Sequence, residues 1–75
     1  MARTRRHWWN GKWGRLARRD IFIRQTPSGV ELELREGGYD GRSVRATFPT
    51  EGSAVVEAER RMQPHPTDDW REVSS

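Results

Sequence analysis

A segment in which apolar and charged side chains strictly alternate constrains this chain more than any other feature. In residues 30–36, Val30, Leu32 and Leu34 are separated by single charged residues. Successive side chains of a β-strand point to opposite faces, so this pattern predicts a strand with one face in a core and the other toward solvent. We therefore expect an antiparallel sheet that is covered on one side.

Two neighbouring segments have the composition of strands. Residues 20–25 are rich in β-branched and aromatic side chains and run into 26–29, where Pro and Gly stand at positions that favour a tight turn. The glycine-rich segment 37–41 then allows a reversal before residues 42–48, whose Val, Ala and Phe recur at every second position. The sequence predicts a three-stranded antiparallel meander over 20–25, 30–36 and 42–48.

After this third strand the apolar spacing changes to three and four, which predicts a helix over residues 51–62. Thr50 is suited to the N-cap, and Glu51 is favourable in the first turn. Prolines in 63–66 end the helix. The expected fold is α+β with the order β-β-β-α, in which the helix covers one face of the sheet. The predicted core consists of Ile21, Ile23, Val30, Leu32, Leu34, Val44, Ala46, Phe48, Val55, Ala58 and Met62.

The chain divides into three parts on composition: a basic, Trp-rich arm over residues 1–19, the β-β-β-α domain over 20–63, and a Pro-containing tail over 64–75. Within the tail, we expect one further helical turn from Thr67. Trp70 is either an anchor folded back over Phe22 and the sheet edge or part of a loose tail.

Three local structures fit the Trp-rich part of the arm. Asn10 and Gly11 form a strong two-residue hairpin loop, which would place Trp8 opposite Trp13 and resemble a designed tryptophan-zipper hairpin. A helical turn is the second interpretation, because Trp9, Trp13 and Leu16 also have helical spacing. A disordered arm is the third.

The positive charge is concentrated at one end of the chain. Residues 1–19 carry seven bases and no acid, a formal charge of +7, whereas residues 20–75 carry seven bases and eleven acids, a formal charge of −4. Such a basic segment is typical of contact with nucleic acid or an anionic surface. It is equally suited to docking onto the protein's own acidic residues, and the preference for Arg over Lys also fits the codon bias of a G+C-rich genome.

Several classes of function are excluded or disfavoured. The chain has 75 residues and no cysteine, so disulfides, thiolate metal sites and cysteine nucleophiles are excluded and a deep catalytic cleft is not expected. Neither His7 nor His65 belongs to a catalytic or metal-ligand motif. We expect Glu31 and Glu33 to be solvent-side charges that are offset by Arg24 and Arg45 across the sheet, rather than a catalytic pair. No apolar stretch approaches the length of a membrane span or a signal peptide. A cytoplasmic, non-enzymatic protein with no cofactor, metal or small-molecule substrate is therefore predicted.

Nucleic-acid binding by the arm is the leading functional hypothesis. Arginines neutralise phosphates while tryptophans stack on unpaired bases. The sheet face is less suitable, because Glu31 and Glu33 on it would repel phosphates, although a sheet with one helix resembles in topology the arm-binding domain of tyrosine recombinases and the plant AP2-type domain. The predicted nucleic-acid-binding residues are Arg3, Arg5, Arg6, Trp8, Trp9, Lys12, Trp13, Arg15, Arg18 and Arg19.

The alternative is a protein-interaction module. Trp and Arg are enriched at interface hot spots, and a three-stranded sheet leaves two edges open for a protein partner or a second copy of the chain. Contact with anionic lipid is a weaker third hypothesis, since no clear amphipathic helix supports it.

The whole chain also resembles a group of short proteins from high-G+C bacteria such as actinobacteria. The likeness rests on the Arg- and Trp-rich start, on Trp13-Gly-Arg-Leu-Ala-Arg-Arg-Asp-Ile21, on Asp40-Gly-Arg-Ser43 and on the helix that follows. This resemblance implies a bacterial, cytoplasmic setting. It implies no activity and no functional residue.

Overall fold

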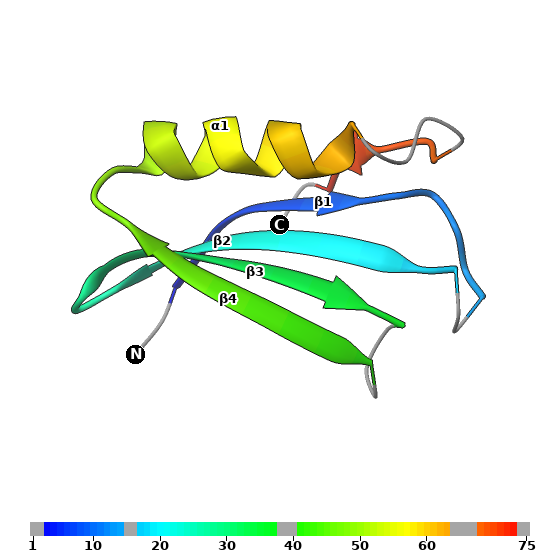
Figure 1. The fold of residues 1–75 in the computed structure, drawn as a ribbon, viewed down its shortest axis with the longest axis horizontal. Coiled ribbons are helices and arrows are strands. Elements are labelled where there is room, and N and C mark those ends of the chain that lie inside the picture. Colours follow the sequence, from blue (N-terminus) through cyan, green and yellow to red (C-terminus); the bar gives the residue numbers. More distant parts are fainter. Residues whose placement is uncertain (1–2, 15–16, 38–40, 64–67, 74–75) are drawn as a thin grey trace.

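The computed structural model describes residues 3–14, 17–37, 41–63 and 68–73, with the side chain of Arg3 left out. Over these residues it is an α+β fold in which one helix lies on one face of a five-stranded antiparallel sheet (Figure 1). The elements are β1 (Arg3–Trp9), β2 (Arg19–Thr26), β3 (Gly29–Glu36), β4 (Arg42–Phe48), α1 (Glu51–Met62) and β5 (Arg71–Glu72). The order of strands in the sheet is β4-β3-β2-β1-β5.

The three predicted strands and the predicted helix are confirmed. Strands β2 and β3 pair in register from Arg19 and Glu36 to the turn between Thr26 and Gly29. The helix begins at the predicted cap: Thr50 Oγ1 accepts a hydrogen bond from the backbone N–H of Ser53 at 3.1 Å, and the Ser53 side chain bonds back to Thr50. The predicted turn at 37–41 lies partly outside the described residues, which include Gly37 in a left-handed conformation with φ 87°.

The expected structures of the N-terminal segment, by contrast, are wrong. Trp8 lies opposite Ile21 and Trp9 opposite Asp20, so Arg3–Trp9 forms a fourth long strand beside β2 rather than a Trp8–Trp13 hairpin, a helical turn or a free arm. Pairing with β2 extends over most of the strand and buries one Trp, whereas the short hairpin would have paired only a few residues. The meander therefore has four strands, not three.

The C-terminal segment also differs from prediction. Arg71–Glu72 is not a helical turn but the short strand β5, which pairs with Trp8 and Trp9 at the outer edge of β1. Of the two alternatives for Trp70, an anchor is observed, but it packs against the core on the helix side of the sheet and not over Phe22. Phe22 follows the buried Ile21 on β2 and so points to the opposite face.

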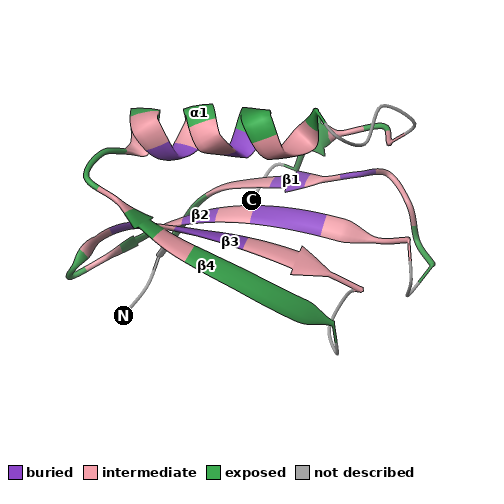
Figure 2. Ribbon diagram, in the orientation of Figure 1, coloured by how far each residue is buried: buried purple, intermediate pink, exposed green. Residues whose placement is uncertain are grey.

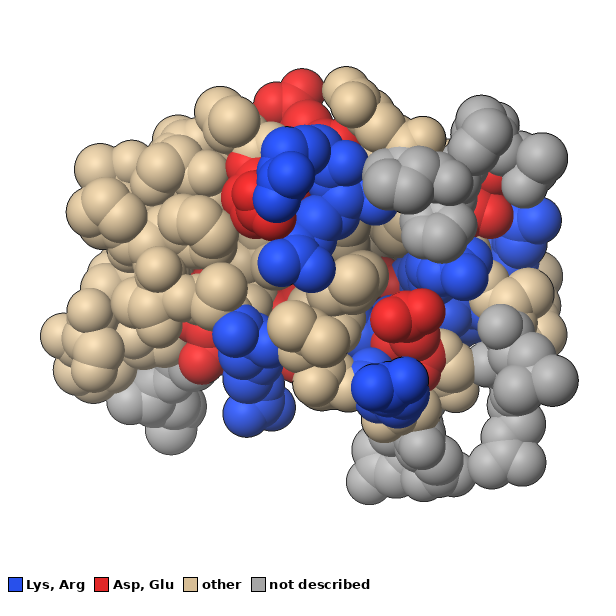
Figure 3. All heavy atoms as spheres, in the orientation of Figure 1, with Lys and Arg blue, Asp and Glu red and all other residues tan. Residues whose placement is uncertain are grey.

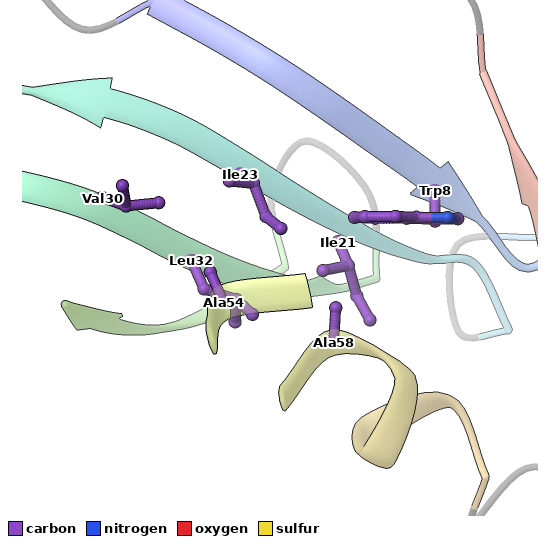
Figure 4. Close-up of a cluster of buried hydrophobic side chains, with 7 residues drawn as sticks. All are labelled: Trp8, Ile21, Ile23, Val30, Leu32, Ala54 and Ala58. Atoms are coloured by element: carbon purple, nitrogen blue, oxygen red, sulfur yellow. The ribbon is translucent and has the colours of Figure 1, made fainter. Parts of the chain in front are cut away.

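The core lies between the sheet and α1, and Figure 4 shows its buried side chains. These are Trp8, Ile21, Ile23, Val30, Leu32, Ala54 and Ala58. Trp8 and Ala54 were not predicted. Leu34, Phe48, Val55 and Met62 are half-buried around this cluster, and Ala46 is half-buried as well. Val44 was predicted in the core but is 46% exposed, because the first half of β4 extends beyond the cover of α1 (Figure 2).

The side of the sheet that faces away from α1 is called the outer face below. It is defined by the residues that alternate with the core positions along the paired strands: His7, Trp9, Asp20, Phe22, Arg24, Glu31, Glu33, Arg35, Ser43, Arg45 and Thr47. The described part of the chain contains no helix that is long and apolar enough to cross a membrane.

Candidate nucleic-acid interface

Most of the predicted binding residues with positive charge are engaged by acidic side chains of the same chain. The pairs are Arg5 with Glu51 at 3.3 Å, Arg6 with Glu72 at 2.8 Å, Lys12 with Asp68 at 3.5 Å, and Arg19 with Asp68 at 3.4 Å and Glu36 at 3.6 Å. Docking onto the protein's own acids, one of the alternatives for the basic segment, is therefore observed for these four residues and for Arg18, which pairs with Asp20 at 2.8 Å. Arg15 and the side chain of Arg3 lie outside the described residues.

Trp8 is not available for base stacking. Its side chain is buried beside Ile21 in the core, and the Arg6 guanidinium lies 4.8 Å from its ring centroid. The two features have one origin, because alternation along β1 places Trp8 and Arg6 on the helix side of the sheet and Trp9 on the outer face. The prediction for Trp8 as a nucleic-acid-binding residue is therefore corrected to a structural role.

Three of the predicted residues, Trp9, Trp13 and Arg18, do come together beside the outer face. The Trp9 and Trp13 rings meet edge to face with centroids 4.5 Å apart, and the Arg18 guanidinium lies 5.4 Å and 5.6 Å from the two centroids. We call these three residues the tryptophan platform. Trp13 is 77% exposed, which is unusual for so large an apolar side chain.

The connection between β1 and β2 holds this platform in place. The buried side chain of Asn10 donates to the carbonyl of Ala17 at 2.7 Å and accepts from the backbone N–H groups of Arg19 at 3.0 Å and Lys12 at 3.3 Å. The indole N–H of Trp9 donates to the carbonyl of Lys12 at 2.9 Å. The loop that carries Trp13 is thus fixed from both of its ends.

A buried carboxylate connects the platform to the rest of the outer face. Asp20 accepts a hydrogen bond from Arg18 Nε at 2.8 Å and lies 2.7 Å from His7 Nε2. Burial raises the pKa of Asp20, but the hydrogen bonds and charges of Arg18 and His7 outweigh it, so the pKa lies below its usual range. Asp20 therefore stays charged and keeps Arg18 oriented near both indoles.

A second buried carboxylate lies under a group of arginines in the middle of the outer face. Glu33 is 1% exposed, in contrast to its predicted place on the solvent side. It accepts hydrogen bonds from Arg24, from Arg35 at 3.2 Å and from the hydroxyl of Ser43 at 2.7 Å, and Arg45 lies 3.9 Å away. The expected pairing with Arg24 and Arg45 is present, but it neutralises a buried charge rather than an exposed one.

This environment holds Glu33 in its charged form. Burial alone raises the pKa of Glu33, whereas the hydrogen bonds from Ser43 and Arg24 and the charges of Arg35 and Arg24 lower it to about 2. Glu33 therefore remains a carboxylate at neutral pH, and its role is to gather arginines rather than to exchange protons.

Phe22 forms the apolar base of the same group. The His7 ring stacks on it with centroids 4.2 Å apart, and the guanidinium groups of Arg24 and Arg35 lie 4.6 Å and 5.0 Å from its centroid. Ring contacts of this kind favour cations electrostatically and restrict their rotamers. The arginines are thus held between an aromatic ring and a buried carboxylate.

The outer face therefore presents arginines to a ligand and buries two of its three carboxylates, while the third, Glu31, keeps 27% of its side chain exposed and lies 3.7 Å from Arg24. The carboxylates of Asp20 and Glu33 are almost fully buried, while Arg18, Arg35 and Arg45 keep about a third to two thirds of their side chains exposed. Among the described residues in the view of Figure 3, basic and acidic side chains lie next to each other. A ligand of this face would meet ordered arginines and an exposed indole.

Sequence reasoning missed Phe22, Arg24, Arg35 and Arg45 as members of the candidate site. The signal was present, since the alternation that placed Leu32 and Leu34 in the core also placed these four side chains on the opposite face. However, two glutamates share that face and would repel phosphates, so the sequence alone favours the arm. Their repulsion is lessened by burial and pairing, which depend on contacts between strands.

No family model, curated protein or solved structure matches this chain. Among the described residues, no three His, Asp or Glu side chains are close enough together to hold a metal ion.

Proposed function

We propose that this protein binds single-stranded nucleic acid on its outer face, with the tryptophan platform as the base-stacking element. The observation that carries the proposal is the exposed indole of Trp13, which is held against Trp9 and lies close to the Arg18 guanidinium. Three residues of the predicted arm remain in the proposed site, and the other contacts come from the outer face of the sheet.

The exposed ring of Trp13 is suited to stacking on an unpaired base. An unpaired base stacks on an exposed aromatic ring with about 1 to 3 kcal/mol, with little dependence on its identity. Trp13 has the required exposure, and its edge-to-face contact with Trp9 reduces the rotamer freedom that would otherwise be lost on binding. A single strand offers such unpaired bases, whereas a duplex keeps its bases stacked and covered.

Arginines along the outer face are suited to contact phosphates. Arg18, Arg35 and Arg45 extend from the tryptophan platform across the outer face to the edge strand β4, and each retains donors beyond those that pair with buried carboxylates. A strand that stacks one base on Trp13 therefore finds cationic groups along the same face. Because each phosphate contact releases counterions, affinity is expected to fall as salt rises.

The test uses fluorescently labelled oligo-dT, oligo-rU and a duplex of about 15 nucleotides, a length matched to small single-strand-binding domains. Titrations by fluorescence anisotropy at about 50 mM and about 200 mM salt are expected to show binding to the single strands that weakens with salt. Trp13→Ala is expected to weaken this binding by about 5-fold to 150-fold, the equivalent of one lost stacking contact.

Two arginines form a matched pair for the phosphate step. Arg45 on the outer face is 62% exposed, and Arg60 on α1 is 74% exposed on the other side of the sheet. Arg45→Ala is expected to reduce the slope of log affinity against log salt by about 0.7, and Arg60→Ala to leave it unchanged. Equal effects of the two substitutions, or binding that is unaffected by Trp13→Ala, would refute the proposed face. Absence of binding at low salt would refute the proposed function.

A further inference from the structure

Strand β4 is an open edge of the sheet, and no other described element covers it. It pairs with β3 over seven consecutive positions without a bulge and contains no proline. Figure 2 shows most of its length as exposed. The opposite edge differs, because β5 covers the end of β1 and a register shift between Thr4 and Arg6 breaks its regularity. Long, regular, uncovered edges are templates for pairing with another strand.

The register of the sheet determines which residues of β4 are free to pair. The backbone N–H of Gly37 donates to the carbonyl of Arg18 at 2.9 Å, one step beyond the last pair of the β2–β3 ladder. Alternation along antiparallel strands then directs the backbone groups of Leu34 toward β4 and those of its partner Val44 back toward β3. The backbone groups of the intervening residues, Ser43, Arg45 and Thr47, point to the open side.

The edge also exposes an apolar side chain that belongs to the core side of the sheet. Val44 is 46% exposed, and Leu34 opposite it is only half-buried. In Figure 1 the Arg42 end of β4 runs away from α1, which leaves this corner of the apolar face without a helix above it. An additional strand beside β4, with its own helix on the same side, would extend the core over this corner.

We propose that a second copy of this chain pairs with β4 in antiparallel orientation, about a two-fold axis at Val44. In this register Val44 lies opposite Val44 of the second copy, Ser43 opposite Arg45, and Arg42 opposite Ala46. No like charges face each other. Moving the two-fold axis by one residue, from Val44 to Arg45, would place Arg45 opposite Arg45, which charge repulsion disfavours. The register centred on Val44 is therefore self-complementary, and it brings the two exposed Val44 side chains together on the axis.

The geometry of this pairing follows from the open backbone groups. Ser43 of each copy forms a hydrogen-bonded pair with Arg45 of the other, and the two Val44 residues form the non-hydrogen-bonded pair on the axis. Because the two-fold axis is perpendicular to the sheet, the helices of both copies lie on one side of the joined sheet and both outer faces lie on the other. This dimer does not depend on nucleic-acid binding, although the two outer faces would form one continuous surface.

The sharpest test is a disulfide, because the chain contains no cysteine of its own. In a non-hydrogen-bonded antiparallel pair the Cα atoms are about 4.5 Å apart, which lies within the range that a disulfide spans. Val44→Cys is therefore expected to give a covalent dimer under mild oxidation at least about tenfold faster than Val56→Cys, since only the former gains from a high effective concentration. Val56 is the matched control, because it is 67% exposed on α1, away from the edge.

Sedimentation of the unaltered protein gives an independent readout. From about 1 μM to about 1 mM, the range of weak association, a concentration-dependent dimer is expected. Val44→Lys is expected to abolish this dimer by placing two like charges on the axis, whereas Val56→Lys leaves it intact. A monomer at every concentration, together with equal oxidation rates of the two cysteine variants, would overturn the proposal. The edge would then be open to a strand from a different protein.

Discussion

Replacing Glu33 with Gln tests whether the buried carboxylate stabilises the sheet. The pKa of Glu33 falls from its ordinary value of 4.5 to about 2 in the folded protein. At about 1.4 kcal/mol for each unit of pKa, the folded state favours the charged carboxylate over the neutral acid by about 3 kcal/mol. Gln resembles the protonated acid in shape and lacks its charge. Glu33→Gln is therefore expected to lower the free energy of unfolding at neutral pH by about 3 kcal/mol, a large share of the stability of so small a domain.

The pH dependence of the free energy of unfolding distinguishes the contribution of the Glu33 charge from that of packing. Because the folded pKa is lowered, the contribution is complete above the unfolded pKa of 4.5 and is lost as the pH falls toward 2. Between about pH 5 and about pH 3, the unaltered protein is expected to lose about 2 kcal/mol more stability than Glu33→Gln. The pKa values of Asp20, Glu57 and Glu72 are also lowered, but these groups titrate in both proteins and cancel in the difference.

The assay is urea unfolding, followed by tryptophan fluorescence at a series of pH values. Equal slopes of unfolding free energy against urea concentration in the two proteins would support two-state behaviour. Parallel pH profiles for the two proteins would show that the charge of Glu33 contributes nothing to folding. Such a result would refute the reasoning that Arg24, Arg35 and Ser43 more than offset the burial of this carboxylate.

Three further predictions concern the fold, and each is measured by the same urea unfolding. Leu32→Ala removes a fully buried side chain and is expected to destabilise the protein by about 2 to 5 kcal/mol, so that unchanged stability would contradict its place in the core. Thr50→Ala removes the cap of α1 and is expected to cost about 1 kcal/mol, with a matching loss of helical circular dichroism. Gly11→Ala is expected to destabilise by about 1 kcal/mol or more, because Gly11 has φ 78° and an added Cβ would lie 3.0 Å from the carbonyl oxygen of Asp69. Gly52→Ala is its control and is expected to stabilise by about 0.5 to 1 kcal/mol, since Gly52 lies in α1 and an added Cβ would meet only Thr50 Oγ1, at an ordinary contact distance of 3.9 Å. Similar effects of the two glycine substitutions would contradict the account of Gly11.

The central part of the fold was predictable because its signals are local. The alternation in β3, the turn between Thr26 and Gly29, and the cap at Thr50 each depend on neighbouring residues. Such patterns determine which residues share a face and where an element begins. They were sufficient to predict β2, β3, β4 and α1 with nearly the observed bounds.

The N-terminal strand was missed because its partner lies in another part of the chain. Arg6 and Trp8 alternate with His7 and Trp9 as they should in a strand, but the many charged residues conceal the pattern. A local hairpin signal at Asn10 competed with it. Pairing with β2 prevails, since it buries Trp8 in the core and lets the side chain of Asn10 satisfy three backbone groups of the connecting loop.

The candidate site was only partly predictable from the sequence, for a related reason. Exposure of Trp13 and its proximity to Arg18 depend on how the loop folds back on β1 and β2, which no short sequence pattern specifies. The burial of Glu33 likewise depends on Arg24, Arg35 and Ser43, which lie on three different strands and meet only when the register of the sheet is known.

The environment of Asn10 has a consequence for how this protein ages. An Asn followed by Gly is the pair most prone to lose its side-chain ammonia, because the next backbone nitrogen attacks the side-chain carbonyl to form a cyclic imide. In the folded protein the Asn10 amide is fully buried and bonded at both its nitrogen and its oxygen, so it is held away from this reaction. Deamidation therefore requires the loop to open. The rate at which the mass of the peptide containing Asn10 and Gly11 increases during storage would report how often that loop comes apart.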